Sequence, residues 1–161
     1  MEEGQEPEDP GFTLVEVTLA LTLLMIGLLG FIGAIVSTQV MVRVTAERNI
    51  ANTAIISTIE EFREACAEDF VAAVTAYQNA TNLYPERLLG LGEGAVMSSV
   101  VILDENLLTP PIDLDSNGVF VDILTPEEVN AAVLRVRVAW NGPRGPSDIE
   151  HTNIVARGQI W

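Results

Sequence analysis

The sequence has no lysine, one cysteine and one histidine in its 161 residues. Its eight basic residues are all arginine and are outnumbered by 23 acidic residues, so the formal net charge is −15 at pH 7. Because a nucleic-acid binder needs clustered cations to neutralise phosphates, we expect no nucleic-acid partner. Cys66 has no second cysteine for an intrachain disulfide, and the alanines on either side of it favour a small buried apolar role.

The chain also lacks a recognisable catalytic motif. No serine, cysteine or lysine nucleophile stands with a plausible base in a known arrangement. His151 is close to Asp148 and Glu150, which would suit an acid–base group or a metal site, but a lone histidine in a polar segment is more often a surface residue. We therefore predict that the protein is not an enzyme.

Charged residues are absent from residues 17–42, a run of 26 positions. As a helix this run would be roughly 39 Å long, which exceeds the ~30 Å hydrocarbon core of a bilayer. A cleaved secretory signal has a basic start, a shorter apolar stretch and a small-residue cleavage site after it, and this run has none of them. We predict a retained transmembrane helix over residues 12–42, in preference to the buried helix of a soluble protein.

Three glycines, Gly27, Gly30 and Gly33, repeat at three-residue steps within this run. Small residues at that spacing line one helical face and let a neighbouring helix approach closely. Glycine is also simply common in membrane helices. The regular spacing between bulky neighbours favours helix packing.

Glu16 lies at the start of the apolar run, five residues after Gly11. An ionised carboxylate in hydrocarbon is unfavourable by several kcal/mol, so acidic residues in a membrane usually have a partner or a function. The alternative is a glutamate at the headgroup boundary that is ionised and solvated without a partner.

The segment Gly11-Phe12-Thr13-Leu14-Val15-Glu16, followed by the apolar residues 17–24, resembles the type III signal of type IV prepilins and pseudopilins. The stretch Ile26-Gly27-Leu28-Leu29-Gly30 is similar to the V-type minor pilins, also called type IV pilus modification proteins, and to the I-type minor pseudopilins of type II secretion. The resemblance covers residues 11 to about 45.

The resemblance implies three roles. Gly11 would be the last residue of a leader, residues 1–11, that a prepilin peptidase removes. Phe12 would then be the N-methylated new N-terminus, and Glu16 would pair with the N-terminal amine of an adjacent subunit in a helical fibre. The partners would be the peptidase, other pilin or pseudopilin subunits and membrane lipid.

The resemblance also implies a location. The protein would cross the inner membrane once, with residues 43–161 as a pilin-like domain in the periplasm or extracytoplasmic space, and would enter a fibre after assembly. It does not distinguish a type IV pilus from a type II secretion or DNA-uptake pseudopilus. The competing hypothesis is a signal-anchored extracytoplasmic enzyme or binding domain whose N-terminal helix stays uncleaved.

The leader departs from the family pattern, because it carries acidic residues and no base. The first basic residues, Arg43 and Arg48, follow the apolar run, so the positive-inside rule places residues 43–161 inside the cell. The motif implies the opposite orientation. We follow the motif, because three residue types in register rarely occur by chance. The acidic residues are Glu2, Glu3, Glu6, Glu8 and Asp9.

Beyond Arg43 the helical period continues in amphipathic form, which predicts one long helix that ends between Asp69 and Asn82. Residues 96–103 and 132–140 alternate as strands, and residues 153–161 would return as a partner strand after a long loop at 141–146. We predict an α+β fold, with the long N-terminal helix packed on a small antiparallel sheet. Its apolar positions are Ala51, Ile55, Ile59, Phe62, Cys66, Phe70, Ala73 and Tyr77 on the helix, and Leu134, Val136, Val138 and Trp140 on the sheet.

Asp113, Asp115 and Asn117 place oxygen ligands at alternate positions before Gly118, as in a calcium loop. The glutamate expected six residues after the glycine is missing, because position 124 is leucine. We favour a polar turn that leads into a strand at residues 119–123, and predict no cofactor. Thr125-Pro126-Glu127-Glu128 has the pattern of a helix start.

Overall fold

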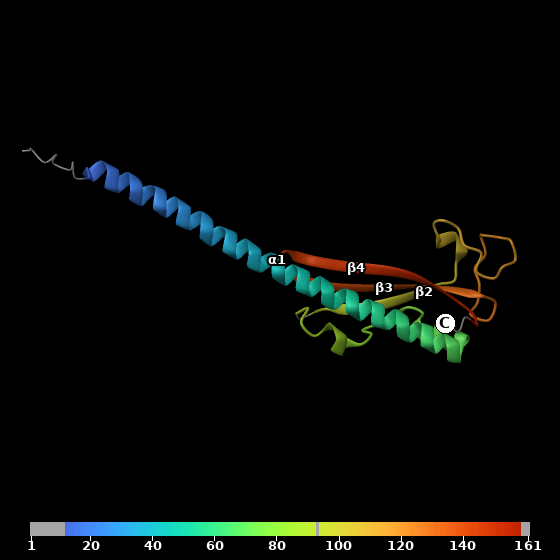
Figure 1. Cartoon of the computed structure of the whole chain (residues 1–161). Helices are drawn as coiled ribbons and strands as arrows, with labels where there is room; N and C mark the ends of the chain where they lie inside the picture. Colours follow the sequence, from blue (N-terminus) through green and yellow to red (C-terminus); the bar gives the residue numbers. More distant parts are fainter. Residues whose placement is uncertain (1–11, 93, 159–161) are drawn as a thin grey trace, which may run out of the picture. The chain divides into compact units, whose positions relative to one another are not determined.

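The computed structural model describes residues 12–92 and 94–158 (Figure 1). The helices are α1 (Leu14–Glu68) and α2 (Phe70–Tyr77), with short 3-10 helices η1 (Pro85–Leu88) and η2 (Glu105–Leu107). The strands are β1 (Ala80–Thr81), β2 (Val96–Ile102), β3 (Ala131–Gly142) and β4 (Gly145–Ala156). The chain divides into two compact units, one up to Val42 and the other from Arg43 onward.

The second unit has the predicted α+β architecture. Its four strands form one antiparallel sheet in the order β1-β2-β3-β4, and the part of α1 beyond Arg43 packs on that sheet (Figure 1). The predicted strand at residues 96–103 is β2, and the predicted strand at 132–140 is the central part of β3. The four residues assigned to the core face of β3, Leu134, Val136, Val138 and Trp140, are all buried.

The apolar face predicted for the helix is also buried, at all eight positions named above. The helix is not continuous, however. α1 ends at Glu68, because Asp69 has an extended backbone (φ −146°, ψ 100°) and its side chain accepts a hydrogen bond from the Ala72 N–H. Asp69 is therefore the N-cap of α2, which carries the buried face on to Tyr77.

The long loop predicted between the last two strands is wrong. β3 and β4 are joined by a two-residue turn at Pro143–Arg144, and β4 begins at Gly145 instead of residue 153. The residues assigned to the loop extend the pairing, and Gly145 supplies the positive φ of 103° that follows the turn. Across the solvent face, Arg137 pairs with Asp148 at 3.1 Å and Arg135 with Glu150 at 3.3 Å. Trp161 and the end of the predicted return strand lie outside the described residues.

Glu47 is a charged residue of the amphipathic part of α1, yet it is buried. The residue is 3% exposed, and its Oε2 accepts a hydrogen bond of 3.1 Å from the Trp140 indole N–H. Its Oε1 lies 3.0 Å from Nε of Arg43, one helical turn earlier. Glu47 therefore joins α1 to β3 from inside the core, where Trp140 is buried as predicted.

The connection between β2 and β3 contains neither the strand predicted at residues 119–123 nor a helix from Thr125. Residue 123 makes only an isolated bridge with Asp104. Thr125 donates hydrogen bonds from its backbone N–H and its hydroxyl to Oε2 of Glu128, each 2.8 Å long. These two hydrogen bonds lower the pKa of Glu128. The helix-start geometry therefore forms locally, but no helix follows it.

Candidate functional site

The start of α1 is built from Thr13 and Glu16. The Thr13 N–H and hydroxyl donate to Oε2 of Glu16 at 3.1 and 3.0 Å, and the Glu16 N–H donates back to the Thr13 hydroxyl at 3.3 Å. This is a capping box, with threonine at the N-cap and glutamate three residues later. The Thr-x-x-Glu spacing before an apolar run is the usual sequence signal of this motif, although the predictions above do not include it. Phe12 beside it is 87% exposed, and Gly11 lies outside the described residues.

The capping box gives Glu16 partners within its own chain. A carboxylate near a helix N-terminus is stabilised by the unpaired N–H groups and by the helix dipole. Helix initiation is thus a sufficient local reason for a glutamate at this position. A pairing of Glu16 with a neighbouring subunit's amine remains a hypothesis.

The apolar part of α1 is long and hydrophobic enough to cross a membrane, with a mean hydropathy of 2.6 over 18 residues and none of that window buried. Large side chains such as Leu19, Ile26 and Phe31 are more than 60% exposed. A Cβ atom placed on Gly27, Gly30 or Gly33 would meet nothing within 4 Å. In the part of the chain that the structure describes, this face is therefore open to lipid or to another helix.

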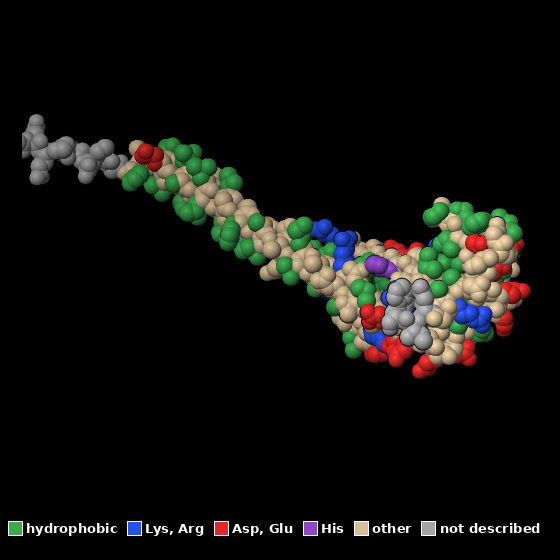
Figure 2. All heavy atoms as spheres, turned by 45° about the vertical axis from the view of Figure 1, so that its right-hand side comes forward, with side chains coloured by type: hydrophobic (Ala, Val, Ile, Leu, Met, Phe, Trp, Pro, Cys, Tyr) green, Lys and Arg blue, Asp and Glu red, His purple; other side chains and the backbone are tan. Residues whose placement is uncertain are grey.

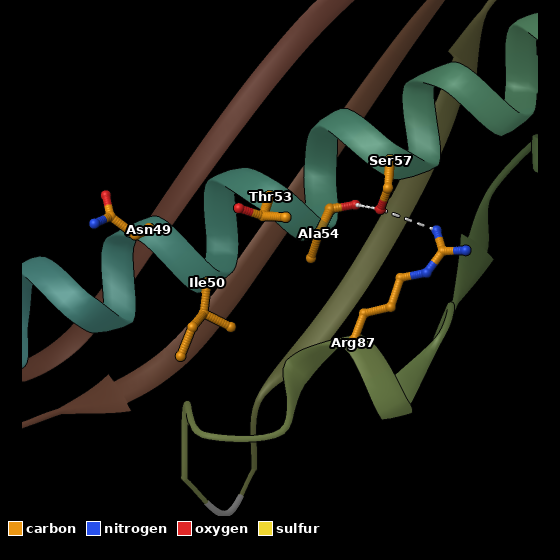
Figure 3. Close-up of a pocket in the computed structure, with 6 residues that line it drawn as sticks. All are labelled: Asn49, Ile50, Thr53, Ala54, Ser57 and Arg87. Carbon is orange, nitrogen blue, oxygen red and sulfur yellow. Dashed lines mark hydrogen bonds between the residues drawn. The ribbon is translucent and has the colours of Figure 1, made fainter.

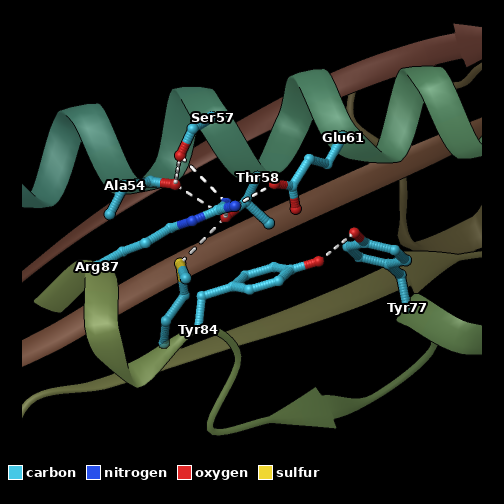
Figure 4. A network of polar contacts seen from close by, with 8 residues as sticks. Ala54, Ser57, Thr58, Glu61, Tyr77, Tyr84 and Arg87 are labelled. Atoms are coloured by element: carbon cyan, nitrogen blue, oxygen red, sulfur yellow. Dashed lines mark hydrogen bonds and ion pairs between the residues drawn. The ribbon is translucent and has the colours of Figure 1, made fainter.

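A polar network joins η1 to the part of α1 that belongs to the second unit (Figure 4). Arg87 forms an ion pair with Glu61, donates to the Ser57 and Thr58 hydroxyls at 3.2 and 3.4 Å, and stacks 3.9 Å above the Tyr84 ring. The hydrogen bond from Arg87 lowers the pKa of Glu61. Burial, together with the hydrogen bond to Tyr77, raises the pKa of Tyr84.

A groove of about 410 Å³ lies beside this network (Figure 3). Among the described residues that line the groove, Arg87 is the one with a positive charge, and that charge already has Glu61 as its partner. We assign the network a structural role, the attachment of η1 to α1. The groove is lined by Asn49, Ile50, Thr53, Ala54, Ser57 and Arg87.

The pairing of Glu61 with Arg87 predicts a pH effect. A carboxyl group whose pKa is lowered by folding stabilises the fold above its ordinary pKa of 4.5, and this stabilisation is lost as the pH falls through the folded-state value. Between pH 6 and pH 3, wild type should therefore lose more stability than Arg87→Met. The difference should be below about 1 kcal/mol, because the Glu61 side chain is 39% exposed.

The measurement is chemical denaturation of the detergent-solubilised full chain, followed by circular dichroism at several pH values. Arg63→Met is the matched control, because Arg63 is exposed and bonds to the neutral amide of Asn153. A pH dependence in Arg87→Met as steep as that of wild type would contradict the assignment.

The acidic loop brings Asp113 and Asp115 together with a third carboxylate, Glu105, and one oxygen of each lies within 4.8 Å of the others. Asn117, the third ligand of the considered calcium loop, uses its side-chain oxygen to accept the Val119 N–H at 2.6 Å. Its amide group donates to Asp115 at 2.7 Å, and its backbone N–H donates to Asp113 at 3.1 Å. Desolvation raises the pKa of Asp115, and Asp113 raises it further.

These hydrogen bonds account for the arrangement of the loop without a cation. Glu105 is fully buried and accepts the N–H groups of Leu114 at 2.6 Å and Asp122 at 3.3 Å. The distance of Glu105 from the Asp-x-Asp-x-Asn pattern explains why the sequence did not indicate its part in the cluster. The three carboxylates are of the donor type that suits calcium.

The other candidate groups have ordinary surroundings. Cys66 is buried, and burial raises the pKa of its thiol to about 11, which disfavours the reactive thiolate. His151 is exposed and lies 3.2 Å from the side-chain oxygen of Asn52. Its two acidic neighbours in the sequence, Asp148 and Glu150, face arginines across the sheet.

Comparison with family models, with curated proteins and with solved structures finds no match to this chain. Any functional argument therefore depends on the residues themselves.

Proposed function

We propose that this protein is a minor pilin or pseudopilin, a structural subunit made as a membrane-anchored precursor. A prepilin peptidase would cleave after Gly11 and methylate Phe12, and the subunit would then enter a type IV pilus or a type II secretion-like pseudopilus. The observation that supports this most is the placement of Glu16, a lone carboxylate five residues after Gly11 at the start of an apolar helix.

The form of α1 supports the same proposal. Its first part exposes large apolar side chains and three unobstructed glycines, and its second part carries a folded α+β domain. A helix of this kind can leave the lipid for a bundle of similar helices, because both surroundings are apolar. The domain then stays in water while the helix changes its neighbours.

The electrostatics give Glu16 a specific task in such a bundle. Cleavage after Gly11 would create an ammonium group at Phe12, and an ammonium and a carboxylate are each costly to bury alone. Paired in a low-dielectric bundle, they neutralise each other. A shift of one subunit along its neighbour would leave both charges unpaired, so the pair would also fix the axial register.

The capping box supports a second candidate function. If the only task of Glu16 is to start the helix, the chain is a signal-anchored extracytoplasmic domain that binds a ligand or acts as an enzyme, and its N-terminal helix stays uncut. The two functions differ in one observable property, the covalent state of the N-terminus in the membrane.

The experiment that tests the proposal is co-expression of the full chain with and without a prepilin peptidase, followed by intact-mass analysis of the membrane fraction. We expect a mass that corresponds to loss of residues 1–11 and one methylation at Phe12, only when the peptidase is present. Gly11→Val is the control, because a β-branched side chain at the cleavage site should block processing. An uncut wild-type chain in both samples would overturn the proposal and favour the signal-anchored domain.

A further inference from the structure

Five large apolar side chains are exposed on the connection between β2 and β3, between 44% and 78% of each. We call this set, Leu107, Val119, Phe120, Val121 and Ile123, the loop patch. Figure 2 shows hydrophobic side chains gathered on the lobe of the domain that carries this connection. Soluble surfaces rarely keep contiguous apolar groups without a partner for them.

Backbone hydrogen bonds hold the two parts of the loop patch side by side. The Glu105 N–H donates to the Asp122 carbonyl at 3.0 Å, and the Leu124 N–H donates to the Leu103 carbonyl at 3.0 Å. One residue further along, the side-chain amide of Asn106 donates to the Val121 carbonyl at 2.8 Å. Leu107 is therefore next to the 119–123 segment, although more than ten residues separate them in the chain.

The outward orientation of the patch is set by the fold of the connection. Leu108 and Leu114 are buried in the core, and the fully buried Glu105 ties both segments together through the N–H groups of Leu114 and Asp122. The connection thus already has its own apolar anchors. The five side chains of the loop patch are not among the residues of that core, and a preorganised surface lowers the entropic cost of binding.

The charge around the loop patch identifies the kind of partner. Between Asp104 and Leu134 the chain carries no arginine and, besides the buried Glu105, six carboxylates, of which Asp122 stands between Val121 and Ile123 within the patch itself. Such a surface repels anionic lipid headgroups and also the same surface on a second copy of this chain. It attracts a partner that brings positive charge together with apolar groups. The six carboxylates are Asp104, Asp113, Asp115, Asp122, Glu127 and Glu128, and one cation, Arg157, contacts the far end of the connection at the Glu127 carbonyl.

We propose that the loop patch binds another protein, through a segment in which apolar side chains are framed by lysine or arginine. Apolar contact supplies the burial, and the surrounding carboxylates select the cationic partner and speed its approach. This inference does not depend on the cleavage of the N-terminus.

The test uses the full chain in nanodiscs of phosphatidylcholine and two fluorescent peptides of equal length. Both peptides carry the same leucines and phenylalanines, which alternate with arginine in one peptide and with glutamate in the other. We expect the arginine peptide to bind at least tenfold more tightly, with a Kd that rises with salt. The double variant Phe120→Ser, Val121→Ser should weaken this binding at least tenfold.

Leu89→Ser is the matched control, because Leu89 is 77% exposed but lies after η1, outside the loop patch. It should bind the arginine peptide as wild type does. Circular dichroism of each variant checks its folding, and the single variant Val121→Ser replaces the double variant if the latter unfolds.

Four results would overturn the proposal. Equal binding of the two peptides, or equal loss of binding in Leu89→Ser, would indicate general attraction to an acidic or detergent-like surface. Binding of wild type, but not of the double variant, to phosphatidylglycerol vesicles would make the occupant a membrane. A dimer seen by sedimentation in wild type, and lost in the double variant, would make the occupant a second copy.

Discussion

Glu16→Gln is expected to be cleaved and methylated normally, yet to enter fibres at less than a tenth of the wild-type level. Glutamine has nearly the same size and keeps an oxygen that can accept the Thr13 hydrogen bonds, so the helix start survives. It has no charge to offer a neighbour's N-terminal ammonium. An ammonium left unpaired in an apolar bundle is unfavourable by several kcal/mol. A tenfold loss of assembly corresponds to only about 1.4 kcal/mol, so the expected loss is at least tenfold.

The measurement compares the variant in the sheared fibre fraction and in the membrane fraction by immunoblot, in a host that assembles fibres. Thr13→Val is the matched control, since it removes the capping hydroxyl but keeps the Glu16 charge. It should weaken the helix start by about 1 kcal/mol and leave assembly close to wild type. If Glu16→Gln assembles normally while Thr13→Val does not, Glu16 serves only to start the helix.

The second large effect is expected at Glu47, where Glu47→Ala should destabilise the domain by about 2–3 kcal/mol. Truncation leaves the buried Trp140 indole N–H without an acceptor and opens a cavity between α1 and β3. The free energy of unfolding is measured by urea denaturation of the full chain in detergent, followed by circular dichroism. Unchanged stability would contradict a structural role for Glu47.

Glu47→Gln separates the hydrogen bond from the charge. Its amide oxygen can still accept the Trp140 N–H, and the lost ion pair involves Arg43, whose side chain is 69% exposed. We expect a loss below about 1 kcal/mol, because ion pairs open to water contribute little.

A double-mutant cycle with Gly142 gives an independent check on the same site. A Cβ atom at position 142 would lie 2.8 Å from Oε2 of Glu47, so Gly142→Ala should destabilise wild type. The same change should cost much less in Glu47→Ala, because the colliding carboxylate is gone. Additive effects of the two substitutions would place the strain elsewhere.

The sequence predicted those parts of the fold that depend on periodic apolar residues. The buried face from Ala51 to Tyr77 follows from apolar residues that repeat every three to four positions. The inward residues of β3 follow from apolar residues that repeat every second position. In both elements the repeat marks the side chains that the fold buries. The interruption at Asp69 was missed because the apolar period continues across it. The break is confined to Asp69, whose backbone is extended and whose side chain accepts a hydrogen bond from the Ala72 N–H.

Residues whose partners lie far along the chain were not predictable in this way. Glu47 lies four residues before Ala51, on the buried side of the helical period, but a charged side chain normally indicates a solvent position. It is buried because the Trp140 indole N–H, far along the chain, donates a hydrogen bond to it. The part of β4 before residue 153 was not predicted as a strand, because its side chains are polar, and Asp148 and Glu150 in it pair with the arginines on the open face of β3. Glu105 joins the acidic loop through backbone groups that no sequence pattern specifies.

The residues with a proposed function likewise include some that the sequence predicts and some that it does not. The positions of Phe12 and Glu16 relative to the apolar run were readable from spacing alone, and so was the capping box that we overlooked. The loop patch could not be predicted, because Val119, Phe120 and Val121 resemble an ordinary buried strand until the structure leaves them at the surface.

The polar side chains of β4 affect how neighbouring molecules can pair through their sheets. Among the described strands, β4 is an edge strand of the sheet, as is the two-residue β1, and one side of its 12 residues has no neighbouring strand. Such an edge can add a strand from another molecule and begin aggregation, which charged residues and proline oppose. Pro146, Asp148 and Glu150 supply both. Molecules held at high local concentration would then be kept from joining sheet to sheet, and their mutual contacts would be left to the helices.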